Sequence, residues 1–300
     1  MPKSAVYSGK ESFVNDRELT EVTFAKGVTK IGKFAFCGCS ALTAITIPEG
    51  VTTIGRETFY GCSSLAAITI PDSVTMIGDH AFRECSSLAA ITIPDGVTII
   101  GYCTFCDCSS LAAITIPASV KSIGFRAFQG CSSLTAITIP EGVTTIGDSA
   151  FGVCSSLTAI TIPVGVTTVG NWAFQGCSSL AAITIPASVT TICEGAFMAC
   201  TALTRLSLSP AVYIGDTSFL NCTALISAAA DQNMPSVKAL LHSRWYAIRE
   251  RVTVLSCLKT LFTTQKKRKR EDGGEAQTLG VTATRKRLPK VMWRVILEFL

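Results

Sequence analysis

The apolar positions of this 300-residue chain recur every 23 residues, from about residue 19 to about residue 225. Three columns of identical residues show the period. Proline occupies Pro48, Pro71, Pro94, Pro117, Pro140, Pro163 and Pro186. Phenylalanine occupies Phe36, Phe59, Phe82, Phe105, Phe128, Phe151, Phe174 and Phe197, and a cysteine follows each of them by three residues. Such a period predicts a solenoid, in which each unit buries its apolar side against its neighbours.

One period, residues 65–87, shows the elements expected in every coil. Isoleucine alternates with threonine over residues 67–70, which predicts a short strand with one buried face. A proline then ends this strand, and residues 74–77 predict a second extended piece. Residues 79–84 predict one helical turn, with Asp79 placed to cap its N-terminus. The fold class expected is therefore an α/β repeat solenoid of about nine coils.

Composition changes along the chain, and the changes divide it into five expected segments. We expect an N-terminal cap over residues 1–18, the repeat solenoid over 19–225, a helical C-terminal cap over 226–264, a disordered basic linker over 265–284 and a short amphipathic helix over 285–300. Apolar residues at helical spacing after residue 236 favour the helical cap.

The repeated pattern C-S/T-x-L-x-x-I-x-I-P-x-x-V-x-x-I-G-x-x-A-F-x-x-C resembles the BspA-type leucine-rich repeat, the fifth of the common leucine-rich repeat classes. The resemblance covers about 200 residues. It implies a right-handed superhelix with short stacked strands. It also implies a surface, adhesion or protein-binding module without catalytic residues, so no cofactor is expected. No phosphate-binding loop or nucleophile motif appears in the sequence, which agrees with a chain that is not an enzyme.

The chain has 14 cysteines, and most of them belong to one repeat column. Free cysteine packs as a small hydrophobe, so stacked thiols filling the interior are expected. An oxidised ladder is the alternative, because coils about 4.8 Å apart would tolerate disulfides. The groups Cys37/Cys39 and Cys103/Cys106/Cys108 imitate metal-ligand spacing. Neither of the two histidines lies near them in sequence, so no metal site is expected.

The first 13 residues contain no apolar segment of the kind found in export signals, and no run of about 18 apolar residues occurs. These observations predict an intracellular protein, cytoplasmic or nuclear, with free thiols. They also predict no membrane span.

The charge of the chain is divided unevenly. Residues 1–225 carry 11 Lys+Arg and 15 Asp+Glu, a net of −4, whereas residues 226–300 carry 15 and 6, a net of +9. The densest basic run is Lys266, Lys267, Arg268, Lys269 and Arg270. It predicts either a nuclear-import address with an import receptor as partner, or a nucleic-acid contact. A solvated linker is the alternative. Specific recognition of DNA is not expected, because no stacking aromatics or recognition helix accompany the charge.

The two positions after the column glycine vary from coil to coil, although most other positions are copies. The candidate partner-binding residues at these positions are Phe34, Arg56, His80, Tyr102, Phe125, Arg126, Asp148 and Trp172. Aromatic residues and arginine are enriched at interface hot spots, so this stripe is a candidate contact surface. Neutral drift on a solvated edge would explain the same variation. The threonines at the strand centres offer a second, flat and neutral face.

Residues 288–300 resemble the opening of an F-box, L-P-x-x-x-x-x-x-I-L-x-x-L, although the chain stops before the remaining helices. A lone docking helix is the alternative interpretation. The hypothesis favoured by the sequence is a non-enzymatic scaffold that binds a protein partner through its solenoid face. The two rivals are a substrate-recognition subunit of a ubiquitin ligase and a cell-surface adhesion module.

Overall fold

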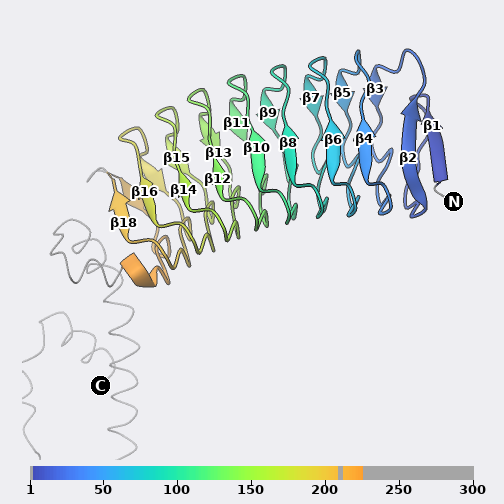
Figure 1. The fold of residues 1–300 in the computed structure, drawn as a ribbon. Helices are drawn as coiled ribbons and strands as arrows, with labels where there is room; N and C mark the ends of the chain where they lie inside the picture. Colours follow the sequence, from blue (N-terminus) through green and yellow to red (C-terminus); the bar gives the residue numbers. More distant parts are fainter. Residues whose placement is uncertain (1–2, 209–211, 226–300) are drawn as a thin grey trace, which may run out of the picture. The chain divides into compact units, whose positions relative to one another are not determined.

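The computed structural model describes residues 3–208 and 212–225, all of which belong to the first of two compact units, Met1–Arg244. The predicted helical cap at 226–264, the linker at 265–284 and the helix at 285–300 lie outside the described residues. The described residues form a parallel β-solenoid, in which each coil contributes one strand to each of two ladders (Figure 1).

The first ladder holds the strands that alternate isoleucine with alanine and threonine. It consists of β4 (Ala44–Thr46), β6 (Ala67–Thr69), β8 (Ala90–Thr92), β10 (Ala113–Thr115), β12 (Ala136–Ile137), β14 (Ala159–Ile160), β16 (Ala182–Thr184) and β18 (Arg205–Ser207). Strands pair in parallel and in register, so that Ile45 lies beside Ile68. In each strand the isoleucine, or Leu206 in β18, points inward, and the threonine or serine that follows it is exposed, as the period-2 pattern predicts.

The second ladder consists of very short strands near the column glycine. They are β3 (Lys30–Ile31), β5 (Thr53–Ile54), β7 (Met76–Ile77), β9 (Ile99–Ile100), β11 (Ser122–Ile123), β13 (Thr145–Ile146), β15 (Thr168–Val169), β17 (Thr191–Ile192) and β19 (Tyr213–Ile214). The odd-numbered strands from β9 to β19 form one continuous six-stranded parallel sheet. The predicted leucine-rich-repeat solenoid with short stacked strands is therefore confirmed.

The predicted helical turn at residues 79–84 is wrong. This segment is a series of tight turns, in which His80 and Glu84 have left-handed φ values of 56° and 61°. Its alternate N–H groups point to the next coil: His80 donates to the carbonyl of Tyr102 at 2.8 Å, and Phe82 to that of Thr104 at 2.9 Å. Asp79 does not cap a helix, because its Oδ1 accepts the N–H of Tyr102 at 2.9 Å. Hydrogen bonds between coils thus replace the bonds that a helix would make within one coil.

The phenylalanine column forms the centre of the solenoid. From Phe36 to Phe219, successive rings are stacked with centroids 5.2–5.5 Å apart and interplanar angles of 1–11°. Offset stacking at this distance is a favoured arrangement for aromatic pairs. Each ring from Phe59 to Phe197 has another ring on both faces, so the column joins the coils into one core.

The cysteine column lies beside the rings, and its thiols have a specific partner. Each thiol, from Cys39 to Cys222, donates to a phenylalanine carbonyl of the preceding turn of chain at 3.0–3.2 Å. The cysteines of the described residues are free. Burial raises the pKa of Cys177 to about 12 and that of Cys131 well above its ordinary value. These thiols therefore stay protonated at neutral pH.

The N-terminal segment covers the first coil. Strand β1 (Lys3–Tyr7) pairs in parallel with β2 (Leu19–Phe24). The ring of Phe13 stacks on Phe36 at 5.7 Å, and the buried hydroxyl of Tyr7 accepts the N–H of Gly32 at 2.8 Å. The outer face of the first ring in the column is thus covered by two aromatic side chains.

Candidate functional site

The candidate residues from the sequence lie along the tight turns that follow the second ladder, and we name this row the turn stripe. In each coil from Phe34 to Trp172, the second residue after the column glycine has a left-handed φ of 50–60°. Its N–H donates to the carbonyl of the first stripe residue in the next coil at 2.8–3.0 Å. The backbone therefore makes the contact between coils, and the side chains are not needed for it. This geometry explains why the sequence varies here.

Four stripe residues from three successive coils touch one another, and we name them the aromatic patch: His80, Tyr102, Phe125 and Arg126. The rings of His80 and Tyr102 have centroids 4.6 Å apart. Those of Tyr102 and Phe125 are stacked at 5.1 Å with an interplanar angle of 7°. The guanidinium carbon of Arg126 lies 4.8 Å from the centroid of Phe125. Tyr102 remains 41% exposed, so the patch presents ring surface to solvent.

The other stripe residues make separate local contacts. Arg56 pairs with its neighbour Glu57 at 2.9 Å. Asp148 accepts the backbone N–H of Asn171 at 2.8 Å and its side-chain amide at 3.1 Å.

Phe34 and Trp172 lie in other coils than the aromatic patch. The Trp172 ring is 41% exposed and lies over Gly195, where an added Cβ would come within 2.3 Å of the ring. The sequence placed all of these residues in one stripe, but it did not indicate which of them touch.

A polar cluster in neighbouring columns was not predicted from the sequence. The guanidinium of Arg83 lies 5.4 Å from the ring centroid of Tyr60 and 3.1 Å from a carboxylate oxygen of Glu84. The Tyr60 hydroxyl donates to the same oxygen at 3.2 Å. The signal was present, because these columns hold glutamine and glycine in several other coils, such as Gln129 and Gly130.

Electrostatics leave Arg126 as the only cation within the aromatic patch at neutral pH. Burial lowers the pKa of His80, and the nearby Arg83 and Arg56 lower it further. Glu57 and Asp79 act in the opposite direction but do not reverse the shift. His80 is therefore neutral at pH 7 and contributes ring surface to the patch rather than charge.

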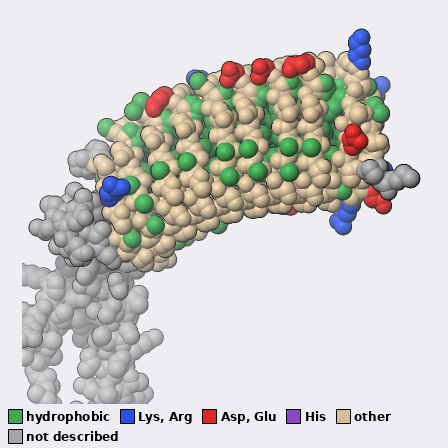
Figure 2. Space-filling view, viewed as in Figure 1, with side chains coloured by type: hydrophobic (Ala, Val, Ile, Leu, Met, Phe, Trp, Pro, Cys, Tyr) green, Lys and Arg blue, Asp and Glu red, His purple; other side chains and the backbone are tan. Residues whose placement is uncertain are grey.

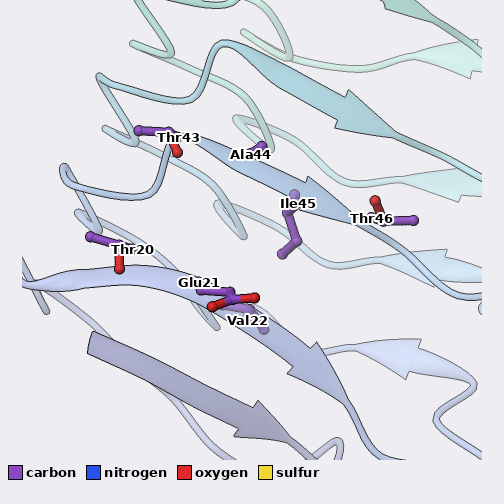
Figure 3. Close-up of a pocket in the computed structure, with 7 residues that line it drawn as sticks. All are labelled: Thr20, Glu21, Val22, Thr43, Ala44, Ile45 and Thr46. Carbon is purple, nitrogen blue, oxygen red and sulfur yellow. The ribbon is translucent and has the colours of Figure 1, made fainter. Parts of the chain in front are cut away.

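The first ladder offers a different surface. Its threonines are exposed in every coil from Thr46 to Thr184. Figure 2 shows this face with few charged side chains, apart from acidic ones along one edge. A shallow hollow of about 470 Å³ lies where β2 and β4 face each other, lined by Thr20, Glu21, Val22 and residues 43–46 (Figure 3). The hollow is an open dip between two strands, without converging charged groups.

Residues 3–208 and 212–225 contain neither a candidate metal site nor a candidate membrane-spanning helix. This part of the chain has no group of three or more His, Cys, Asp or Glu side chains placed to hold a metal ion. It also has no helix of sufficient length and apolarity to cross a membrane.

The repeat geometry can be compared with known proteins. The model of the BspA type leucine-rich repeat region matches residues 7–135 and 121–243. The chain belongs to this family. A leucine-rich repeat protein from Bacteroides ovatus is 29% identical, with 74% of this chain and 73% of that chain covered and a TM-score of 0.59. A leucine rich cell surface protein from Faecalibacterium prausnitzii is 31% identical, with 71% and 73% covered and a TM-score of 0.47. A search of curated proteins found no match.

The intracellular location predicted from the sequence is contradicted by these comparisons. Similar solved structures of this repeat type include the F. prausnitzii cell surface protein. They also include the pneumococcal vaccine antigen PcpA, 18% identical over 70% of this chain and 66% of that chain, with a TM-score of 0.44. The basic run Lys266–Arg270 and the F-box-like residues 288–300 lie outside the described residues, and the family match does not extend to them.

Proposed function

We propose that this leucine-rich repeat scaffold is a non-enzymatic protein-binding module with an adhesion-type role, and that the aromatic patch is its contact surface. The observation that carries the proposal is the continuous series of contacts from His80 to Arg126, in an array where most other positions repeat the same residues from coil to coil. Aromatic and arginine side chains dominate the binding energy of protein interfaces.

The scaffold supports this role through its rigidity. The turn-stripe backbone is hydrogen-bonded from coil to coil, so the patch side chains are presented on an ordered support. Binding then costs less conformational entropy than it would on a mobile loop. The family resemblance supports the same role, because proteins with this repeat include a cell surface protein and a vaccine antigen.

The experiment uses the full chain on an array of purified extracellular proteins, with each binder's affinity then measured. For a binder, Tyr102→Ala, Phe125→Ala and Arg126→Ala should each weaken binding by about tenfold or more, as expected of hot-spot residues. Thr115→Ala, on the exposed strand face, is the matched control and should change the affinity less than about twofold. Loss of binding in the control with intact binding in the patch variants would assign the contact to the strand face and overturn the proposal. So would the absence of any binder on the array.

A further inference from the structure

Two thiols outside the cysteine column have no role in the packing described above. Cys103 and Cys106 lie in the turn of one coil, directly beside the aromatic patch. At the same two positions, neighbouring coils hold His80 with Arg83 and Arg126 with Gln129. One coil holds a thiol at both positions, whereas the cysteine column recurs from coil to coil.

The environment of the pair differs from that of the column. Column thiols such as Cys108 donate to a phenylalanine carbonyl, whereas Cys103 and Cys106 lie close enough for each to shift the pKa of the other. The side chain of Tyr102 in the patch also lies near Cys103 and lowers the pKa of its thiol. The thiol of Cys106 lies 3.3 Å from a carboxylate oxygen of Asp107.

The backbone places the two residues at bonding distance for a disulfide. The N–H of Cys106 donates to the carbonyl of Cys103 at 3.2 Å, which closes a four-residue turn. The Cα atoms at the ends of such a turn are less than about 7 Å apart, and disulfides span about 4.4–6.8 Å. Each thiol shifts the pKa of the other, which places the two side chains close together.

We propose that Cys103 and Cys106 form a thiol–disulfide exchange site that small disulfides oxidise reversibly. The Cys103 sulfur bonds to one sulfur of the small disulfide and breaks its sulfur–sulfur bond, so that the other sulfur leaves as a thiol carrying the Cys103 proton. The Cys106 sulfur then attacks the mixed disulfide at Cys103 and releases the second small thiol, which carries the Cys106 proton. Two protein thiols are thus oxidised to one disulfide while the small disulfide is reduced to two thiols.

The surroundings assign the attacking role to Cys103. Burial raises the pKa of Cys103, but hydrogen bonding with Cys106 and the positive charges of Arg83 and Arg126 act against this rise. Burial and the Asp107 carboxylate both raise the pKa of Cys106. A thiol close to guanidinium groups and hydrogen-bond donors is the better nucleophile. Cys103 and Cys106 are 2% and 4% exposed, so access requires movement of the side chains above them, among them the exposed ring of Tyr102.

The test treats the reduced full-length chain with bis(2-hydroxyethyl) disulfide under native conditions. Remaining thiols are alkylated after denaturation, and peptides are mapped by mass spectrometry. We expect Cys103 and Cys106 to lose alkylation together through a bond between them, reversibly on treatment with dithiothreitol, while the column thiols from Cys62 to Cys200 stay reduced. Cys106→Ser should accumulate the mixed disulfide on Cys103, because no second thiol resolves it.

The matched control is Cys37→Ser, which removes a half-buried thiol at the position equivalent to Cys106 and should leave the oxidation of the pair unchanged. The proposal is overturned if the wild-type chain keeps both thiols reduced. It is also overturned if oxidation spreads over the column, or if the adduct in Cys106→Ser forms at other cysteines. The wild-type peptide map decides the question even if a variant folds poorly.

Discussion

The phenylalanine column and the turn stripe are both built from residues that recur once per coil, yet one is constant and the other varies. In the column, the ring itself makes the contact between coils, with ring centroids 5.2–5.5 Å apart. In the stripe, a backbone N–H and a carbonyl make that contact in every coil, and side chains add contacts only in some coils. The comparison shows that an array of copies tolerates substitution where the backbone carries the contact and resists it where the side chain does.

The largest expected effect is a truncation in the column. Phe128→Ala removes a ring that is buried and stacked on both sides, and we expect it to lower the free energy of unfolding by about 3–5 kcal/mol. The matched stripe change, Phe125→Ala, should cost about 1 kcal/mol or less, because it removes one stacking contact and one cation–π contact at a partly exposed site.

Urea unfolding followed by circular dichroism measures how much free energy of unfolding each variant loses. Equal losses would show that the stripe side chains also hold the coils together, and the contrast between the two regions would fail. The ratio of the two losses matters more than either value, since both variants are compared with the same wild-type chain.

The second-largest expected effect concerns the column glycine, where the backbones of neighbouring coils approach each other closely. A Cβ at Gly147 would lie 2.8 Å from the carbonyl carbon of Gly124 and from the nitrogen of Phe125. Gly147→Ala should therefore destabilise the chain by about 1–3 kcal/mol through overpacking. At Gly152 the nearest atom to an added Cβ is 3.4 Å away, so Gly152→Ala is the matched control and should change stability by about 0.5 kcal/mol or less. Thermal melts that show the reverse order would contradict this account of the close approach.

The third effect concerns alkaline pH. Burial raises the pKa of Cys131 well above its ordinary value, so the folded chain keeps a proton that the unfolded chain releases above about pH 8.5. This contribution to stability is fully present below that pH and declines as pH rises, by up to about 1.4 kcal/mol per pH unit for each such thiol. Cys131→Ala should flatten the slope of unfolding free energy against pH above pH 9 by about that amount.

The half-buried Cys37 provides the comparison for this slope, and Cys37→Ala should change it less. Unfolding curves at a series of pH values from about 7 to 10.5 give the slopes. If Cys131→Ala left the slope unchanged, the thiol would be titrating in the folded chain, and the packing of the cysteine column would need another explanation.

Much of the fold could be predicted because the chain repeats itself. Alternation in residues 67–70 predicted the first-ladder strands, and the repeat columns predicted that Phe59 and Phe82 lie in the interior of neighbouring coils. The helical turn at residues 79–84 was wrong for a physical reason. Asp79 and the residues after it suit a helix N-terminus locally, but neighbouring coils offer carbonyl acceptors to alternate N–H groups. Hydrogen bonds between coils therefore outweighed the local helix propensity of this segment.

The candidate site could be predicted only in part. Variation identified the stripe, because departures from the repeat stand out against copies. It did not identify the aromatic patch, since the contact of His80 with Tyr102 joins the second stripe position of one coil to the first position of the next. That diagonal offset follows from the left-handed turn, which non-glycine residues such as His80 adopt here without a local sequence signal.

The smallest effect lies within the aromatic patch and sharpens its electrostatic description. Burial lowers the pKa of His80, so between its folded and unfolded pKa the unfolded chain binds more protons than the folded one. This contribution to stability is present above about pH 6.5 and is lost as pH falls through the lowered pKa.

His80→Gln keeps a polar side chain of similar size without the titration. Its unfolding free energy should therefore fall less steeply than that of the wild type between pH 7 and pH 5. The second histidine, His242, is present in both chains and cancels in the comparison. A steeper fall in the variant would mean that Glu57 and Asp79 outweigh the causes that lower the pKa, and identical slopes would mean that they balance them; either result contradicts the lowered pKa.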